Sequence, residues 1–175
     1  MISRLLLLPS IIVALLTGCV TETVKSTSVP KLNTPIQTVP ETELLDIGVV
    51  IFDPGTGSLD DDELVYPEVR KAESTFVATK LADSLSNQGG WGAVRVVPDD
   101  RQFSDLLVEG RIESSDGEVL KLQIRVKDAR GEIWLDKPYK GITSRFAYEQ
   151  TTRVQREPFL TVYRTIANEI LEIFT

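Results

Sequence analysis

Two neighbouring groups of residues in the first half of the chain have types that could do chemistry. The first is Gly55-Thr56-Gly57, which follows an apolar run and precedes a helical pattern, as a phosphate-binding loop does. It lacks the third glycine and the Lys-Ser/Thr ending of nucleotide-binding loops, and four acids at 60–63 would repel phosphate. Those acids are consecutive, whereas an EF-hand alternates its calcium ligands. We therefore predict a solvated loop that binds neither nucleotide nor metal.

The composition of the chain disfavours catalysis. Its 175 residues include no histidine, which removes Ser-His-Asp and Cys-His pairs and the usual general base at neutral pH. A single cysteine can form neither an internal disulfide nor a cysteine cluster for a metal. Two carboxylates could serve a glycosidase, but among 26 Asp+Glu a chance pair is always available. We expect a protein that is not an enzyme; a histidine-free carbohydrate-active enzyme is the least favoured alternative.

The single cysteine, Cys19, ends a segment with the features of a secretory signal. Arg4 supplies the positive charge, and the apolar stretch over 5–16 is long enough for a signal core but too short to span a membrane. The run Leu16-Thr17-Gly18-Cys19 resembles the bacterial lipobox, which implies cleavage before Cys19 and acylation of it. That covalent lipid is the only cofactor we expect. The residue after the cysteine is Val20 and not Asp, which would signal retention in the inner membrane. The chain resembles outer-membrane lipoproteins in this respect.

The sequence therefore predicts three parts. Residues 1–18 are the lipoprotein signal peptide, 19–44 are a lipidated Thr- and Pro-rich tether, and 45–175 are a single domain. The tether has few large apolar residues and buries too little surface to offset its ordering entropy. We expect a flexible spacer of roughly 27 Å; a docking arm that orders on a partner is the alternative.

The domain is predicted to be α+β, with the element order β-α-β-β-β-β-α and a mixed sheet that carries helices on at least one face. The apolar run over 46–52 indicates a central strand, because both of its alternating sets are apolar. Helical spacing of apolar and small residues indicates a helix from Pro67 to Gln88. Further strands are expected over 93–97, 106–113, 119–127 and 132–139, and a helix from Pro158 onward.

The hairpin between 106–113 and 119–127 allows a sharper prediction. The inward-facing residues are even-numbered in both strands, so directly paired residues must have an even sum. This parity excludes a two-residue Asp116-Gly117 turn and favours a three-residue loop with Gly117 in the left-handed conformation. The register sets Arg111 opposite Lys121, which is a like-charge pair.

A basic stripe stands out in a chain whose net charge of −7 argues against nucleic-acid binding. The stripe lies on the outward side of the expected strand 119–127 and of the neighbouring strand 106–113. Trp134 lies between two residues predicted to face inward, so we expect it on the same outer face. Trp and Arg are enriched at interface hot spots. A solvated face, with Trp134 covered by 141–157, is the alternative. The predicted partner surface consists of Arg111, Lys121, Arg125, Lys127 and Trp134.

Four stretches of the domain carry a resemblance to known proteins. They are Tyr66-Pro67-Glu68-Val69-Arg70, Trp91-Gly92-Ala93-Val94-Arg95-Val96-Val97-Pro98, Gly110-Arg111-Ile112 with Ser115-Asp116-Gly117-Glu118, and Ile166-Ala167-Asn168-Glu169. The chain resembles a group of uncharacterised proteobacterial envelope lipoproteins, which implies no particular activity. In element order it is also similar to the amino-terminal domain of the Tol-system propeller protein (TolB). The same order is similar to the lipoprotein domain of curli and exopolysaccharide export machines, which assembles into rings.

Together these features predict a lipoprotein at the periplasmic face of the outer membrane that acts as a non-catalytic protein-binding or scaffolding module of the cell envelope. The expected partners are the membrane, through the lipid, and either an envelope protein or further copies of the chain, with no nucleic acid. The alternative function is a ring-forming accessory subunit of a secretion or polysaccharide-export complex.

Overall fold

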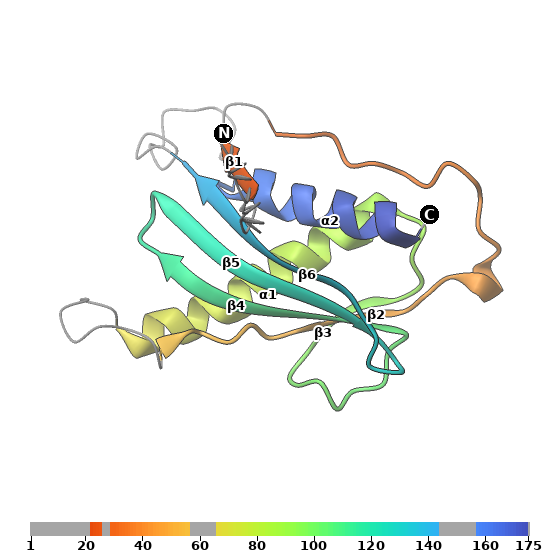
Figure 1. Ribbon diagram of the computed structural model, residues 1–175, viewed down its shortest axis with the longest axis horizontal. Helices are drawn as coiled ribbons and strands as arrows, with labels where there is room; N and C mark the ends of the chain where they lie inside the picture. Colours follow the sequence, from red (N-terminus) through yellow and green to blue (C-terminus); the bar gives the residue numbers. More distant parts are fainter. Residues whose placement is uncertain (1–21, 26–28, 57–65, 144–156, 175) are drawn as a thin grey trace, which may run out of the picture.

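A mixed sheet of six strands, with two α-helices on one face, makes up the computed structural model (Figure 1). The structure describes residues 22–25, 29–56, 66–143 and 157–174. The signal peptide over 1–18, Cys19 and the acids at 60–63 therefore lie outside the described residues. The elements are β1 (Glu22–Lys25), η1 (Glu41–Glu43), β2 (Ile47–Val50), α1 (Pro67–Gln88), β3 (Val94–Val97), β4 (Leu106–Ser115), β5 (Val119–Asp128), β6 (Ile133–Ile142) and α2 (Leu160–Phe174).

The strands follow the order β1-β6-β5-β4-β2-β3 across the sheet. The pairs β1/β6, β2/β3 and β2/β4 are parallel, whereas β4, β5 and β6 form an antiparallel meander. The predicted α+β class and the element order from β2 to α2 are confirmed. Among the helices of the described part, none is long and apolar enough to cross a membrane.

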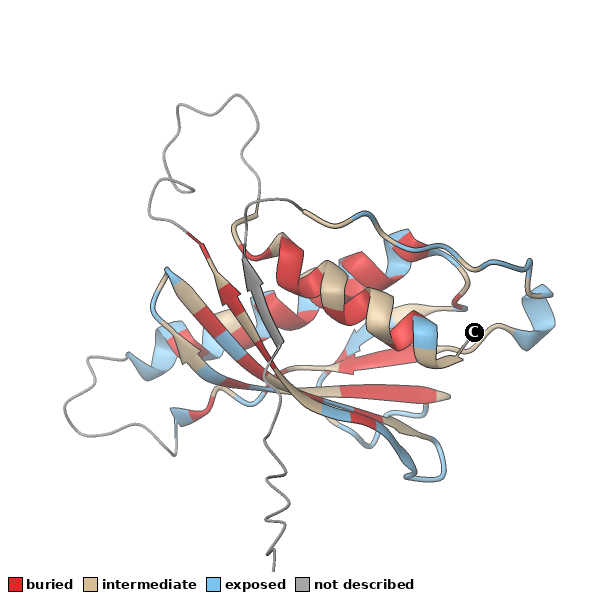
Figure 2. Cartoon of the chain, turned by 45° about the horizontal axis from the view of Figure 1, so that its top comes forward, coloured by how far each residue is buried: buried red, intermediate tan, exposed pale blue. Residues whose placement is uncertain are grey.

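The helices form where the sequence pattern places them. α1 begins at Pro67, whose fixed φ suits a first helical residue, and it stops before Gly89, which has a φ of +73°. Its small residues Ala78 and Ala82 are buried, which brings the helix close to the sheet. α2 buries one half of its surface, as its broad apolar stripe predicts. The core lies between these helices and the inner face of the sheet (Figure 2).

The β4–β5 hairpin confirms the predicted parity of its strands. Ile112 pairs with Leu122, and both side chains are buried on the helix side. Gly117 has a φ of +86°, which confirms the left-handed conformation at the turn. The carboxylate of Asp116 accepts hydrogen bonds from the backbone N–H groups of Glu118 and Val119, at 2.9 and 2.7 Å. These bonds hold the turn and lower the pKa of Asp116.

The predicted register of this hairpin and the predicted position of its loop are wrong. A β-bulge lies between Ile112 and Ser114, and beyond it the pairing sums are odd. The bulge absorbs one residue, so the turn lies over 116–118 instead of 115–117 and the core residues still face inward. Arg111 consequently lies opposite Gln123 rather than Lys121, which avoids the like-charge pair.

Part of the predicted tether packs against the domain. β1 adds a parallel edge strand to β6, and the described segment from residue 29 onward runs along α2. Arg164 donates to the carbonyl of Pro30 at 3.1 Å, and the Asn168 side-chain amide donates to the carbonyl of Lys31 at 2.9 Å. The same Asn168 accepts from the N–H of Asn33 at 2.8 Å. Polar groups of α2 thus order a segment that has too little apolar surface to order itself, which the prediction of a flexible spacer missed.

Candidate functional site

The candidate site is the outer face, which is the side of β4, β5 and β6 opposite the helices. On β5 the inner residues Leu122, Ile124 and Val126 are fully buried, and the alternate residues point outward. Both helices pack on the inner side, and in the described part of the chain no helix covers the outer face. The predicted basic residues of β4 and β5 therefore do lie together on this face.

Arg125 is held by a carboxylate of the neighbouring strand. Its Nε and Nη2 donate to Oδ2 of Asp136 at 3.0 and 2.8 Å, and Gln123 donates to the other carboxylate oxygen. Burial alone would raise the pKa of Asp136, but the hydrogen bonds from Arg125 and Gln123 bring that pKa below its usual value of 3.8. The guanidinium is thus fixed in one orientation and its charge is compensated.

Lys127 lies between two carboxylates. Its Nζ is 2.6 Å from Oε1 of Glu109 and 3.3 Å from Oδ2 of Asp100, and its side chain is only 22% exposed. The hydrogen bond to Glu109, assisted by Asp100, raises the pKa of Lys127. Arg111 also has an anionic neighbour, because its Nε lies 3.8 Å from Oδ2 of Asp53.

Lys121 differs from the other three cations. It lies on β5 opposite Lys140 of β6 and opposite Ser114 of β4. Within the described residues, neither lysine has an ion-pair partner. Lys121 and Lys140 form what we call the lysine end of the outer face.

Trp134 does not share the outer face, and this prediction is wrong. Val126 pairs with Leu135 but the next residue, Lys127, pairs with Ile133, so Trp134 is the extra residue of a β-bulge. The bulge reverses the parity: Ile133 becomes 53% exposed opposite Lys127. The Trp134 ring instead packs toward α2, with its centroid 5.3 Å from that of Phe174, and it remains 42% exposed. The alternative cover, 141–157, lies mostly outside the described residues.

Two exposed apolar residues near this bulge were missed by the sequence reasoning. Phe103 is 90% exposed in the loop between β3 and β4, and Ile133 begins β6. The loop is tied to this end of the sheet through Asp100, which pairs with Lys127, and through Asp105, whose carbonyl accepts from Ala129. The exposure of Phe103 could have been predicted from the sequence, because it is a lone aromatic residue among polar ones.

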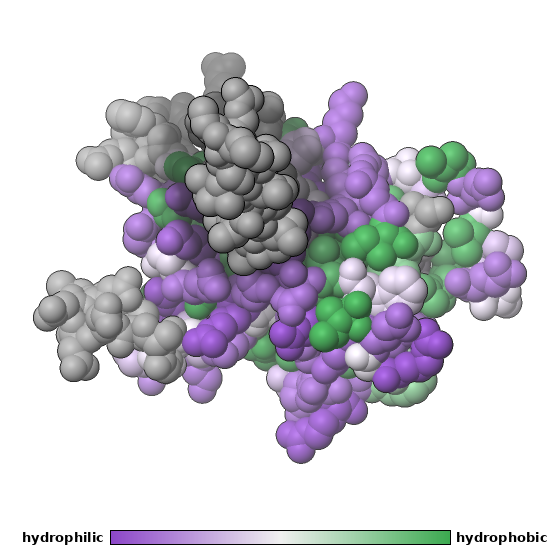
Figure 3. All heavy atoms as spheres, in the orientation of Figure 1, coloured by the Kyte–Doolittle hydropathy of each residue, from purple (hydrophilic) through white to green (hydrophobic). Residues whose placement is uncertain are grey.

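Apolar surface gathers where α2 ends and β6 begins (Figure 3). We call this region, with the outer-face residues next to it, the apolar end. Its members are Phe103, Arg125, Lys127, Ile133 and Trp134. Exposed aromatic side chains and arginines are residue types enriched at the centres of protein interfaces.

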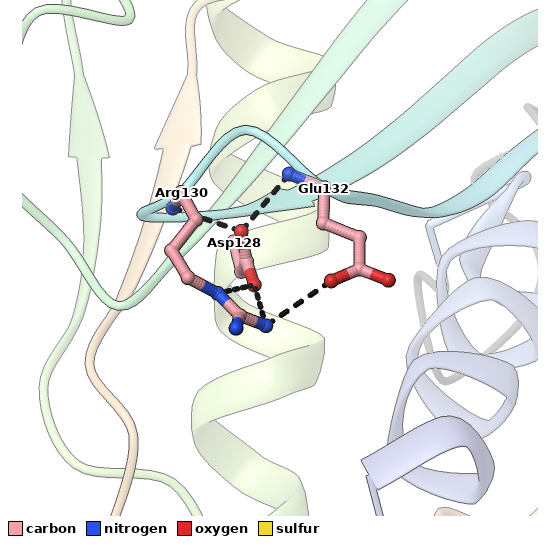
Figure 4. Close-up of polar contacts among 3 residues, drawn as sticks. All are labelled: Asp128, Arg130 and Glu132. Atoms are coloured by element: carbon pink, nitrogen blue, oxygen red, sulfur yellow. Dashed lines mark hydrogen bonds and ion pairs between the residues drawn. The ribbon is translucent and has the colours of Figure 1, made fainter.

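A charged cluster in the β5–β6 turn serves the turn itself (Figure 4). Oδ1 of Asp128 accepts from the N–H groups of Arg130 and Glu132 at 2.8 and 3.0 Å, and Oδ2 accepts from the Arg130 guanidinium. Burial works against ionisation of Asp128, but the hydrogen bonds from Glu132, Arg130 and Trp134 lower its pKa. The described residues contain no group of three side chains suited to hold a metal ion.

A cleft of about 210 Å³ lies between α1, the β4–β5 turn and the start of α2. Both of its carboxylates are engaged by the protein: Glu73 accepts from the Ser115 hydroxyl at 3.1 Å, and Glu157 accepts from the N–H of Phe159. Burial raises the pKa of Glu157. The cleft is lined by Glu73, Phe76, Val77, Ser115, Gly117, Leu120, Glu157, Pro158, Phe159 and Tyr163.

No protein-family model and no curated protein matches the chain. Among solved structures it is similar to a PelC variant dodecamer from Paraburkholderia phytofirmans, at 17% identity over 84% of this chain and 93% of that chain, with a TM-score of 0.44. A second PelC dodecamer from that organism gives 15% identity, 80% and 94% coverage, and a TM-score of 0.43.

A Xanthomonas campestris protein of the DUF330 family is similar at 11% identity, over 87% of this chain and 93% of that chain, with a TM-score of 0.46. At TM-scores from 0.43 to 0.46, these likenesses carry no argument about what the chain does.

Proposed function

We propose that the chain is a non-catalytic binding module of the cell envelope, held at the periplasmic face of the outer membrane by a lipid on Cys19. In this proposal it binds an envelope protein through its apolar end. Of the five surface residues predicted from the sequence, Arg125, Lys127 and Trp134 belong to this end. Arg111 lies on the outer face between the two ends, and Lys121 belongs to the lysine end.

The observation that supports this proposal is the exposure of large apolar side chains beside fixed cations. Phe103, Ile133 and Trp134 are 90%, 53% and 42% exposed. Ile133 lies opposite Lys127, and Phe103 belongs to the loop whose Asp100 pairs with Lys127. Exposed apolar surface of this kind is typical of a docking site. Because ion pairs already orient Arg125 and Lys127, their contribution to binding would cost little additional side-chain entropy.

Crosslinking in intact cells tests the partner surface. The double variant Phe103→Ala/Ile133→Thr should lose most of the crosslinked partner, identified by mass spectrometry, because it removes the apolar centre of the contact. The control Phe76→Ala/Val69→Thr makes similar changes, Phe to Ala and a β-branched apolar residue to Thr, at two positions of α1 that are 50% and 56% exposed. An unchanged crosslink pattern in the first variant would remove the apolar end as the site.

Fractionation tests the anchor separately. Cys19→Ser should leave the protein unprocessed or soluble, because no acyl chain can be attached. Recovery of this variant in the membrane fraction, at the level of the wild type, would contradict the lipid anchor.

A second candidate function is a ring-forming accessory subunit of a secretion or polysaccharide-export complex. It requires that copies of the chain associate, and the observation that favours it is the edge strand β3. Among the described residues no strand pairs with the far side of β3, and Val96 on this strand is 36% exposed. The PelC structures that the chain is similar to are dodecamers.

Light scattering on the full chain in detergent decides between the two candidates. A ring predicts a large, defined assembly that Val96→Lys dissociates, because a charge at an edge strand opposes strand addition. A monomer at all concentrations would exclude the ring.

A further inference from the structure

The ordering of β1 shortens the connection between the lipid and the domain. Only Val20 and Thr21 lie between Cys19 and Glu22, the first residue of β1. Fully extended, that connection reaches about 10 Å. A flexible tether over 19–44 would instead span roughly 27 Å. The domain is therefore held close to the acyl chains and cannot swing freely away from them.

β1 enters the sheet beside the lysine end. Glu22 pairs with Tyr139, and Thr23 pairs with Lys140, which in turn pairs with Lys121 on β5. Neighbouring strands are about 4.8 Å apart, so both lysines lie within roughly 10 Å of β1. Ile133 of the apolar end is farther from this point, because it is six residues before Tyr139 on the same strand, or roughly 20 Å.

Among the described residues, Lys121 and Lys140 have no carboxylate partner, whereas the other cations of the predicted stripe each have one. Lys121 and Lys140 are direct cross-strand neighbours, and like charges in that position destabilise a sheet. The charge of Lys121 contributes to lowering the pKa of Asp116, but that carboxylate accepts its hydrogen bonds from backbone N–H groups of the turn. An anionic surface outside the chain would supply the missing charge.

We propose that the lysine end rests on the membrane surface, with Lys121 and Lys140 against anionic lipid headgroups, so that the apolar end points into the periplasm. The inference rests on the proposed function, because it needs the lipid on Cys19. Each lysine close to an anionic surface strengthens association by about fivefold, an effect that salt screens. The lipid supplies the attachment, and the lysines fix which side of the domain faces the membrane.

Amine footprinting on the full lipidated chain tests this orientation. The protein is reconstituted into vesicles of phosphatidylcholine, with or without phosphatidylglycerol, and treated with an impermeant amine-acylating reagent. Mass spectrometry then compares Lys121 and Lys140 with Lys71, an exposed lysine of α1. We expect several-fold protection of Lys121 and Lys140 in the anionic vesicles alone, reversed by high salt, and no protection of Lys71.

Charge reversal provides the matched variants. Lys121→Glu should abolish the protection of Lys140 in anionic vesicles, whereas Lys71→Glu should leave it intact. Equal labelling of Lys140 in both kinds of vesicle would overturn the proposal. Protection that persists in neutral vesicles or in detergent would also overturn it, since it would indicate a protein contact there. If the chain fails to float with either kind of vesicle, the anchor itself is wrong and the orientation fails with it.

Discussion

The apolar end and the lysine end both carry cationic side chains, but the two ends differ in whether carboxylates compensate those charges. At the apolar end, Arg125 and Lys127 have carboxylate oxygens at 2.6 to 3.3 Å. At the lysine end, Lys121 and Lys140 face one another with no ion-pair partner in the described part of the chain. Both ends are basic by sequence, yet only the lysine end presents uncompensated charge.

This difference separates two kinds of recognition. A compensated cation offers its apolar stem and a fixed geometry, which suits a protein partner that excludes water. An uncompensated cation offers long-range attraction, which suits a diffuse anionic surface. One strand, β5, thus carries residues for both, separated along its length.

The largest effect on stability is expected at Lys127, whose charge is compensated by two carboxylates. Lys127→Met removes the charge but keeps most of the apolar stem, and it leaves Glu109 and Asp100 without their shared cation. We expect a loss of about 1–2 kcal/mol in the free energy of unfolding, because a half-buried carboxylate loses a charged hydrogen bond. Urea denaturation measures this loss. A Lys127→Met protein as stable as the wild type would show that the two ends do not differ energetically.

The elements were predictable because their signal is local. α1 has its predicted bounds, and the inner residues of β5 are those that alternation indicates, since burial repeats with the period of the element. The two β-bulges were not predictable. An extra residue in a strand leaves the alternation intact on either side of it, and only the partner strand reveals the shift. This is why Trp134 was assigned to the wrong face.

The candidate site was predictable in its residue types but not in its electrostatics. Alternation alone placed Lys121, Arg125 and Lys127 on one face. Their partners are distant in sequence: Asp136 comes from β6, and Asp100 from a loop before β4. No spacing rule relates such positions, so the division of the stripe into two ends required the tertiary structure. The packing of 29–35 on α2 was hidden for the same reason, because its contacts are to a helix more than a hundred residues away.

An intermediate effect on stability is expected from substitution of Asp136, and this effect should become smaller as the pH falls. The folded state holds the pKa of Asp136 below its usual value of 3.8. Its contribution is therefore present above that value and is lost as the pH falls through the folded-state pKa. Asp136→Asn should be less stable than the wild type at neutral pH, by less than Lys127→Met, and the difference should shrink in acid. Arg125→Gln should remove the same acid-sensitive part; a difference that is constant with pH would contradict this.

The smallest effect, and the only one of opposite sign, is expected at the lysine end. Lys121→Met removes one member of a like-charge cross-strand pair and breaks no ion pair within the described part of the chain. The free energy of unfolding should stay unchanged or rise by up to about 0.5 kcal/mol, and any gain should vanish in high salt as the repulsion is screened. Lys140→Met should give the same result, and the double variant should gain no more than either single one, because either substitution already removes the repulsion. A loss comparable to that of Lys127→Met would mean that Lys121 has a compensating anion, and the contrast between the ends would fail.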